Sequence, residues 1–237
     1  MNTKDISGTK ITINRQIFYF LIILIISFIF FELTEIDIFV QDQFYNFSSR
    51  KWLIDRADPV LRFIFYTGLK GILIALGISI FITYLISFRN KKLLIFRKPL
   101  LIVSLSMLTV PLSISLLKEV TNVYCPSQII RYGGKKPYIK VFERYPAEFQ
   151  QQERGKCFPA GHASGGFALM ALYFAFKDKK KRMLGLFLGF ILGWIMGLYQ
   201  MMKGVHFLSH TAISMIISWI IILFIIRSYA GILRCLK

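Results

Sequence analysis

Six long apolar stretches dominate this sequence and constrain its fold more than any other feature. They begin near Ile17, Lys70, Leu100, Gly161, Met183 and Phe207, and they end near Leu33, Phe88, Leu117, Phe176, Tyr199 and Ile226. About twenty apolar residues cross the hydrocarbon core of a bilayer as a helix, and each stretch approaches that length. Hydrophobic residues make up 55% of the chain, which is more than a soluble domain contains. We therefore predict an all-α integral membrane protein with six transmembrane helices, forming a single membrane-embedded domain over residues 1–237.

Basic residues are concentrated in the short connections, and this distribution predicts the orientation. Residues 89–98 and 177–182 are rich in Lys and Arg, and further basic residues precede the first apolar stretch and follow the last. Because cytoplasmic loops carry the excess of Lys and Arg, we expect both termini in the cytoplasm and the longer connections, residues 34–69 and 118–160, on the outer face. The same rule explains much of the net charge of +18, so no nucleic-acid partner is expected.

Polar residues that suit chemistry converge on that outer face. The third apolar stretch ends at Lys118, the fourth begins at His162 and the sixth begins at His206. Ionisable groups at membrane depth are costly and usually mark a functional site. Lys118 taken alone is also compatible with simple snorkelling to the interface, but the two histidine segments are poorly explained in that way.

The segment PAGHASGG, residues 159–166, opens the fourth stretch and suits the binding of an anion. A helix that begins there directs free backbone N–H groups outward, and the preceding loop is rich in Lys and Arg. The small residues from Ala163 to Gly166 also favour close packing against a neighbouring helix. Two histidines, a lysine and a helix amino terminus favour phosphoryl transfer, in which positioning and charge neutralisation do most of the work.

A metal site is not expected. His206 and His210 are four residues apart and share a helical face, as zinc ligands do, but no Glu lies between them and no carboxylate close by in sequence completes a set. We predict an enzyme without metal or other cofactor.

These residues resemble the type 2 phosphatidic acid phosphatase superfamily, whose signature is K-x6-R-P, then P-S-G-H, then S-R-x5-H-x3-D. The matching segments are KEVTNVYCP, PAGH and YQMMKGVHFLSH, in that order, within residues 118–210. The resemblance implies a six-helix membrane bundle and metal-independent hydrolysis of a phosphate ester through a phosphohistidine. It assigns phosphate binding to Lys118, protonation of the leaving oxygen to His162 and nucleophilic attack to His206.

Four positions depart from this signature. Cys125 and Gln200 replace the two arginines, Ala160 replaces the serine, and His210 replaces the aspartate that orients the nucleophile. Lys203 and Arg131 are near enough in sequence to restore the lost charge, and Gly161 still offers its backbone N–H. The candidate site therefore has His206, His162 and His210 as catalytic residues, and Lys118, Gly161, Lys203, Gln200 and Arg131 as phosphate-binding residues.

The expected function is that of a bacterial inner-membrane lipid phosphatase with its active site facing the periplasm. The basic and aromatic outer loop, residues 119–156, favours a bulky phosphorylated lipid as the partner, and lipid A is the first choice by analogy with bacterial branches of the superfamily. Undecaprenyl diphosphate, phosphatidylglycerol phosphate and phosphatidic acid are alternatives, as is transfer of the phosphoryl group to another lipid. A lipid binder or transporter with a degenerate site is the non-enzymatic alternative, and the oligomeric state stays open.

The outer segments also contain two of the three cysteines. Cys125 and Cys157 flank the outer loop, whereas Cys235 falls on the cytoplasmic side. Disulfides persist in oxidising compartments such as the periplasm. We predict a bond between Cys125 and Cys157, with two buried free thiols as the alternative.

Overall fold

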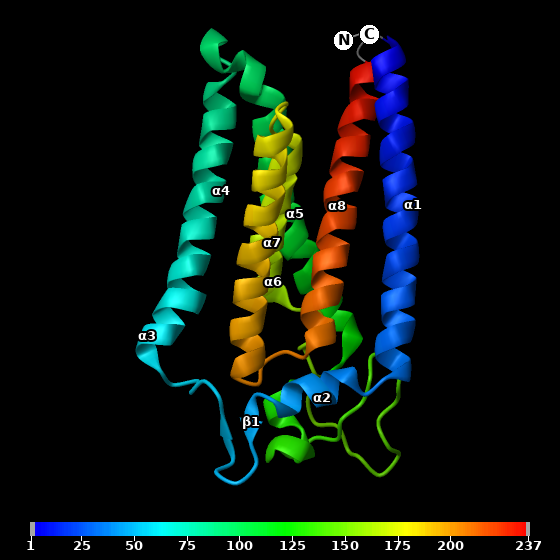
Figure 1. Cartoon of the computed structure of the whole chain (residues 1–237), viewed down its shortest axis with the longest axis vertical. Helices are drawn as coiled ribbons and strands as arrows, with labels where there is room; N and C mark the ends of the chain where they lie inside the picture. Colours follow the sequence, from blue (N-terminus) through cyan, green and yellow to red (C-terminus); the bar gives the residue numbers. More distant parts are fainter. Residues whose placement is uncertain (1–2, 236–237) are drawn as a thin grey trace.

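Long apolar helices run side by side through most of the molecule in the computed structural model, which describes residues 3–235 (Figure 1). Five helical segments within this range are long and apolar enough to cross a membrane. The helices that form them are α1 (Thr3–Leu33), α4 (Leu69–Ile86), α5 (Arg97–Thr121), α7 (Lys179–Met202) and α8 (Leu208–Cys235). Helix α1 packs on α8, and α4 packs on α5. A multi-pass helical membrane protein is therefore what the structure supports.

The fourth predicted span is a shorter element inside the bundle. Residues expected to span from Gly161 to Phe176 form α6 (Gly161–Ala168), which continues as the 3-10 helix η5 (Leu169–Phe174). Eight residues rising about 1.5 Å and six rising about 2.0 Å give roughly 24 Å, which is less than the hydrocarbon thickness of about 30 Å. Helix α6 contacts α5, α7 and α8. The structure therefore shows five helices of spanning length, and the count of six stays a prediction.

The second span begins earlier than the sequence analysis placed it. Helix α3 (Pro59–Arg62) runs through the π-helical segment η1 (Phe63–Gly68) into α4, so the helix begins at Pro59 and not near Lys70. The Asp58 side chain accepts hydrogen bonds from the backbone N–H groups of Val60 and Leu61, both at 2.9 Å. An aspartate cap followed by proline is a strong helix start, and it was overlooked because the apolar run becomes continuous only later.

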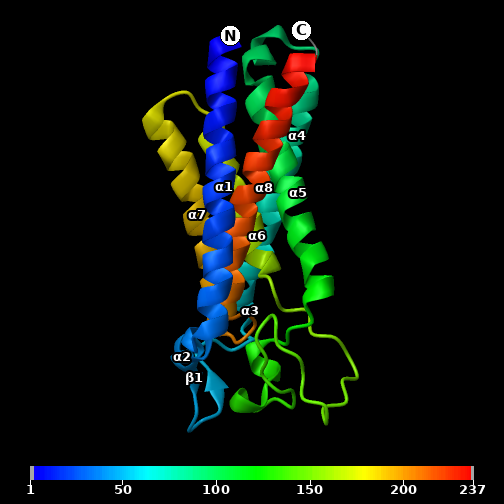
Figure 2. The same ribbon diagram turned by 90° about the vertical axis from the view of Figure 1, so that its right-hand side faces the viewer.

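The longer connections gather at one end of the bundle. This end holds α2 (Ile36–Asp42), the antiparallel hairpin of β1 (Tyr45–Asn46) and β2 (Lys51–Trp52), and the 3-10 turns η3 (Pro126–Gln128) and η4 (Ile130–Tyr132). The beginning of α1, the end of α8 and the basic 3-10 helix η2 (Lys91–Phe96) lie at the opposite end (Figures 1 and 2). This separation agrees with the predicted topology, whereas the assignment of each end to a membrane face stays a prediction.

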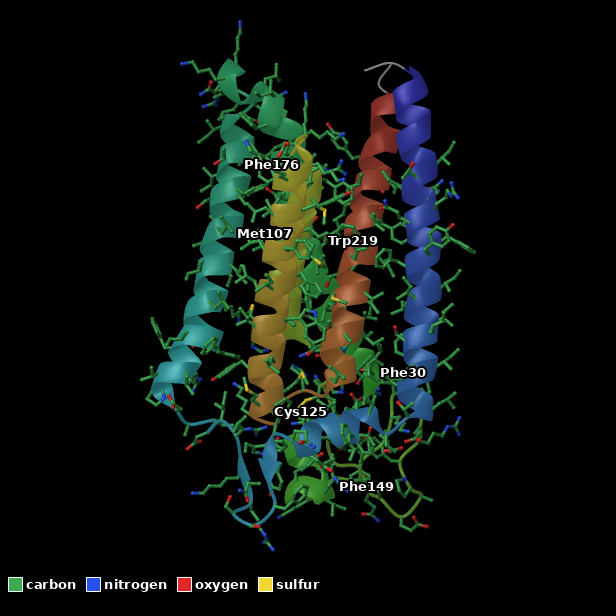
Figure 3. The ribbon with its side chains drawn as sticks, in the orientation of Figure 1. Phe30, Met107, Cys125, Phe149, Phe176 and Trp219 are labelled. Atoms are coloured by element: carbon green, nitrogen blue, oxygen red, sulfur yellow. A yellow bond between two sulfur atoms is a disulfide. The ribbon has the colours of Figure 1, made fainter. Side chains whose placement is uncertain are left out.

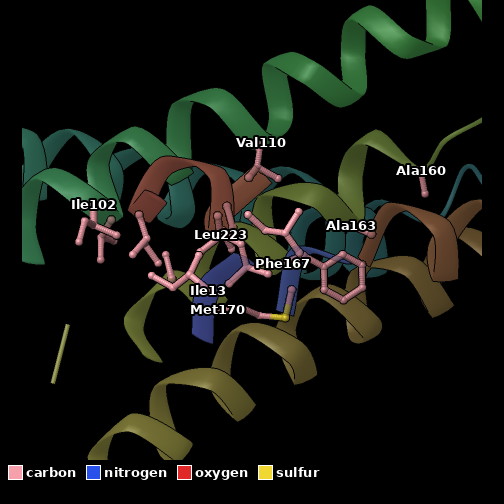
Figure 4. Packing of buried hydrophobic residues seen from close by; sticks show 14 residues of the cluster. Ile13, Ile102, Val110, Ala160, Ala163, Phe167, Met170 and Leu223 are labelled. Atoms are coloured by element: carbon pink, nitrogen blue, oxygen red, sulfur yellow. The ribbon is translucent and has the colours of Figure 1, made fainter. Parts of the chain in front are cut away.

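Glycines bring α6 very close to α7. A side-chain carbon added at Gly166 would overlap the backbone of Gly193, and one added at Gly193 would overlap the ring of Phe167. Gly185, Gly189 and Gly197 extend the same four-residue spacing along α7, which is typical of helices that pack closely in membranes. Phe167, Val110 and Leu223 lie in the core around this contact (Figure 4). The expected close packing of the small residues is confirmed, and it places α6 at the centre of the bundle.

The disulfide between Cys125 and Cys157 ties the outer loop to the end of α5. The two Cα atoms are 5.2 Å apart and the bond closes a segment with a sequence separation of 32 residues. Cys125 lies at the end of the bundle that holds α2, whereas Trp219 and Phe176 lie nearer the other end (Figure 3). Cys157 N also donates to the Val123 carbonyl at 2.9 Å. The predicted bond is confirmed, and it holds the segment before α6 beside the segment after α5.

The outer loop does not present the open aromatic surface that the sequence analysis expected. Tyr132 is buried with Tyr45, Tyr124 and Phe207, and Tyr138, Tyr145 and Phe149 pack against this cluster. Among the loop aromatics Tyr132, Tyr138, Phe142, Tyr145 and Phe149, Phe142 is the one that is exposed, at 69%. The expectation was wrong because these side chains form the hydrophobic core of the loop, which has no long helix to bury them.

Candidate active site

His206 lies in the tight turn between α7 and α8. Gly204 adopts a left-handed conformation with φ of 69°, and Val205 N donates to the Gln200 carbonyl at 2.8 Å. Arg56 secures the turn from outside, because its guanidinium donates to the carbonyls of Lys203 at 2.8 Å and Gly204 at 2.7 Å. His206 is therefore held by backbone contacts on both sides, and only 1% of it is exposed.

The two ring nitrogens of His206 have different surroundings. Nδ1 faces Nδ1 of His210 at 3.3 Å, so one of these atoms donates a hydrogen and the other accepts it. Nε2 is buried and has no hydrogen-bond partner in the described part of the chain. When the proton is on Nδ1, Nε2 carries a free lone pair, which is the form that attacks phosphorus.

His162 lies in the first turn of α6, and an aromatic ring connects it to Lys203. The ring of Tyr66 lies 4.3 Å from the His162 ring, between centroids, and Lys203 Nζ is 4.9 Å from the centroid of the same tyrosine. Lys203 Nζ is also 4.6 Å from the Tyr199 centroid. Two aromatic faces therefore hold the Lys203 ammonium group beside His162. Contact with these faces favours the charged form of Lys203 and fixes the direction of its side chain.

Lys118 reaches the amino terminus of α6 from the last turn of α5. A methyl group placed on Gly161 would come within 3.1 Å of Lys118 Nζ, so the absence of a side chain there leaves room for the lysine. Ala160 N is occupied, since it donates to the His210 carbonyl at 3.1 Å. The next N–H groups belong to the first turn of α6, which is where helices bind anions.

The positive charges around the histidines differ from those predicted from the sequence, because Lys70 contributes and Arg131 is paired elsewhere. Lys118, Lys70 and Lys203 all lie near enough to His162 to interact with it electrostatically. Burial lowers the pKa of His206 well below its ordinary value, and Lys118, His210 and His162 lower it further. Burial also lowers the pKa of Lys203 to about 8, with contributions from Arg56 and Arg62. The pocket therefore keeps His206 neutral and concentrates positive charge.

Two predicted phosphate ligands are placed differently. Arg131 forms an ion pair with Asp42 on the outer loop, with 2.5 Å between Nη2 and Oδ2, so its charge is already matched there. Gln200 is buried. Its contact within the site is made by its backbone carbonyl, which accepts the hydrogen bond from Val205 N that organises the turn before His206. The structure brings Lys118, His162, Lys203, His206 and His210 together, but it engages Arg131 elsewhere.

Several residues at the site were missed by the sequence analysis. Tyr66 and Arg56 lie in the segment predicted as an outer connection, residues 34–69, and Lys70 lies where the second apolar stretch was predicted to begin. The capping pair Asp58 and Pro59 was the signal that would have extended that helix and brought Tyr66 to the membrane face.

Asp37 is another buried residue near the histidines that sequence reasoning did not find. Its carboxylate accepts hydrogen bonds from Ser209 N, at 2.8 Å, and from the Ser209 hydroxyl. Burial raises the pKa of Asp37 to about 6, against the lowering effect of the Ser209 hydrogen bonds. Asp37 belongs to α2 and lies 172 residues before Ser209 in the sequence, so no local sequence pattern connects it to the segment around His206.

Comparison with known proteins identifies the family. A family model described as the PAP2 superfamily matches residues 99–233, which is more than half of the chain. The chain belongs to the PAP2 superfamily. Neither a search of the curated proteins nor a search of the solved structures found a significant match. PAP2 membership identifies a phosphatase acting on lipid-type phosphate esters, and it confirms the resemblance drawn from the three motifs.

The arrangement in this PAP2 protein can bind and attack a phosphate group. It offers a buried imidazole nitrogen without a hydrogen-bond partner, a second histidine at a helix amino terminus, and lysines directed at the same place. No group of three or more His, Cys, Asp or Glu side chains that would hold a metal ion occurs within the range that the structure describes. The expected independence from metal stays a prediction.

Proposed function

We propose that this PAP2 protein hydrolyses a phosphate monoester of a membrane lipid through a phosphohistidine on His206. In the first step Nε2 of His206 attacks phosphorus and the bond from phosphorus to the lipid oxygen breaks, while His162 donates a proton to that oxygen. In the second step His162 takes a proton from water, the water oxygen attacks phosphorus, and phosphate leaves His206.

The convergence around the nucleophile carries this proposal. His206 is buried with Nε2 free, and Lys118, His162 and His210 are its electrostatic neighbours. A phosphoryl group brings at least one negative charge into this pocket and spreads it over three oxygens in the transition state. Lys118, Lys203, Lys70 and the first N–H groups of α6 supply the compensating positive charge, which replaces the charge lost at Cys125 and Gln200.

Lipid A is the first candidate substrate, within a bacterial inner membrane and with the site on the periplasmic face. PAP2 membership and the position of the site at one end of the long helices support a phosphorylated lipid. The outer loop still carries the exposed cations Lys135, Arg144 and Arg154, which suit an anionic head group. Undecaprenyl diphosphate, phosphatidylglycerol phosphate, phosphatidic acid and transfer to a second lipid remain the competing substrates and outcome.

Release of phosphate by purified protein tests the proposal. Full-length protein in detergent is incubated with lipid A, undecaprenyl diphosphate, phosphatidylglycerol phosphate and phosphatidic acid, each carrying a radioactive phosphate, and the enzyme is quenched at alkaline pH to preserve phosphohistidine. We expect turnover of one lipid above the others and a labelled enzyme. His206→Ala should abolish the label and reduce turnover at least about a hundredfold, and His162→Ala should reduce turnover by at least a similar factor.

The control is Gly165→Ala, since a methyl group there meets only Leu73 Cδ1, at 3.5 Å. This variant should match the wild type in membrane insertion, in stability to unfolding and in activity. Full activity of correctly folded His206→Ala would contradict the phosphohistidine. Tight binding of a labelled lipid without release of phosphate would favour the binder or transporter. Deletion of the gene in its host should add one phosphate to lipid A, and an unchanged lipid A profile would exclude that substrate.

A further inference from the structure

The orienting partner of His206 in this chain is a neutral ring and not a carboxylate. The superfamily signature has an aspartate four residues after the nucleophilic histidine, and His210 occupies that position here. A histidine that attacks phosphorus through Nε2 becomes positively charged while Nδ1 keeps its proton. Nδ1 of His210 lies 3.3 Å from Nδ1 of His206 and can accept its proton, but His210 brings no negative charge of its own. The pair therefore needs an anion from another part of the fold.

Asp37 is the carboxylate that the fold brings to this pair. Its side chain binds the backbone N–H and the hydroxyl of Ser209, the residue directly before His210. Asp37 is 7% exposed and His210 is 2% exposed, so solvent would screen a charge on either residue only weakly. Asp37, Ser209 and His210 also line one small cavity of about 20 Å³, so the carboxylate and the ring border the same enclosed space.

The position of Asp37 is fixed by α2. Gln41, one turn further along the same helix, donates from Nε2 to the Met201 carbonyl at 2.9 Å and is fully buried. Helix α2 is thereby attached both to the end of α7 and to the start of α8. The end of α7 and the start of α8 flank the turn that carries His206. Helix α2, which carries Asp37, therefore also holds this turn in place.

Other charged groups near Asp37 leave its negative charge available. Lys140 interacts with Asp37, but its Nζ is bound to Glu35 Oε1 at 2.7 Å and to the Glu32 carbonyl at 2.9 Å. Glu35 opposes ionisation of Asp37, and the neutral Tyr138 ring lies beside them on the cavity wall. The positive charge of Lys140 is therefore shared between Glu35, with which it forms an ion pair, and Asp37.

We propose that Asp37 is the positioning residue of this active site and supplies to His210, across the cavity that both residues line, the negative charge that the signature places at position 210. The inference rests on the proposed function. During attack the Nδ1 proton of His206 is shared with or passed to Nδ1 of His210, and no proton leaves the pair. Asp37 stabilises the resulting positive charge across the small cavity, and the proton returns to His206 when the phosphoenzyme is hydrolysed.

A purely structural role for Asp37 is the competing explanation, because its hydrogen bonds cap the first turn of α8. Two substitutions separate the roles. Asp37→Asn keeps an acceptor for the Ser209 N–H, since asparagine caps helices about as well as aspartate, but it removes the charge. Ser209→Ala removes the hydroxyl bond but leaves the charge and the backbone N–H in place. Each is compared with wild type for thermal unfolding and for hydrolysis of dioctanoyl phosphatidic acid in detergent micelles.

We expect Asp37→Asn to lower kcat at least about tenfold with KM changed less than about threefold, because the lost interaction belongs to the transition state. Ser209→Ala should lower the unfolding temperature more than Asp37→Asn does, yet keep kcat within about threefold of wild type. The double variant Asp37→Asn with His210→Asp restores a carboxylate at the signature position and should recover most of the lost turnover. If Asp37 only capped the first turn of α8, His210→Asp would not restore the lost turnover.

A kcat of Asp37→Asn within twofold of wild type would overturn the inference, and so would a failure of His210→Asp to rescue it. If Asp37→Asn does not accumulate as folded protein, Asp37→Glu and Asp37→Gln provide a pair of equal shape that differs in charge, and equal kcat values for the two would also overturn it. Wild-type protein that is inactive on all four lipids of the substrate panel would count against the proposed function, whereas active wild type with an unaffected Asp37→Asn would count against Asp37 alone.

Discussion

The ring of Tyr66 packs against the ring of His162, with 4.3 Å between their centroids, while Lys203 Nζ lies 4.9 Å from the centroid of the same tyrosine. One side chain from η1 thus sets the position of the proposed acid and of a phosphate-binding cation. The contact uses the faces of the aromatic ring, so the Tyr66 hydroxyl is not required for it.

Tyr66→Ala should therefore lower kcat/KM about tenfold or more, whereas Tyr66→Phe should stay close to wild type. Alanine leaves both His162 and Lys203 free to move, and phenylalanine keeps the face that they contact. Steady-state hydrolysis of phosphatidic acid measures both variants. Equal losses in the two would show that the hydroxyl, and not the ring face, matters.

A single methyl group at the start of α6 should interfere with phosphate binding. In Gly161→Ala the new carbon meets Lys118 Nζ at 3.1 Å and Cε at 3.2 Å, which displaces the flexible end of the lysine and leaves the backbone undisturbed. We expect KM to rise several-fold, by roughly 1 kcal/mol of lost binding, without a change in folding. Gly165→Ala on the same helix is the matched control. An unchanged KM in Gly161→Ala would remove Lys118 from the phosphate site.

Substrate binding should weaken in mildly alkaline solution because the pKa of Lys203 is lowered to about 8. The ammonium group loses its proton as the pH rises through that value, and the pocket loses one positive charge facing the phosphate. Arginine keeps its charge throughout this range. KM of the wild type should therefore rise between about pH 7 and pH 9, and KM of Lys203→Arg should rise much less. The same change at the exposed Lys135 is the control, and a wild-type profile in Lys203→Arg would contradict the assignment.

Removing the disulfide should destabilise the protein and disturb the site. The bond between Cys125 and Cys157 closes a segment with a sequence separation of 32 residues, and loop-closure entropy for that length corresponds to about 3–4 kcal/mol of stability. The double change to serine should lower the denaturant midpoint in detergent and reduce turnover, because Lys118 and Gly161 lie on opposite sides of this link. Mass spectrometry of non-reduced wild type should find neither cysteine alkylated. Unchanged stability of the double variant would contradict this prediction.

Much of the fold was predictable because local sequence controls it. Each long apolar run specifies its own helix in a membrane, where every backbone group must be satisfied within the segment. The order of the runs then placed Lys118, His162 and His206 at one end of the bundle, and the segments around these residues resemble the PAP2 signature. The start of the second span was misplaced because a cap, and not hydrophobicity, determines where that helix begins at Pro59.

The sequence by itself determined the membrane helices, the common end of the bundle for the histidines, and the family. Only the tertiary structure decided which other side chains join them. Tyr66 and Lys70 reach His162 from another helix, and Asp37 reaches Ser209 across 172 residues. Arg131 is close in sequence to the first motif, yet it pairs with Asp42. A helix periodicity reports only on neighbours within a few residues, whereas these contacts depend on how the helices and loops pack, so their partners become apparent only when the chain is folded.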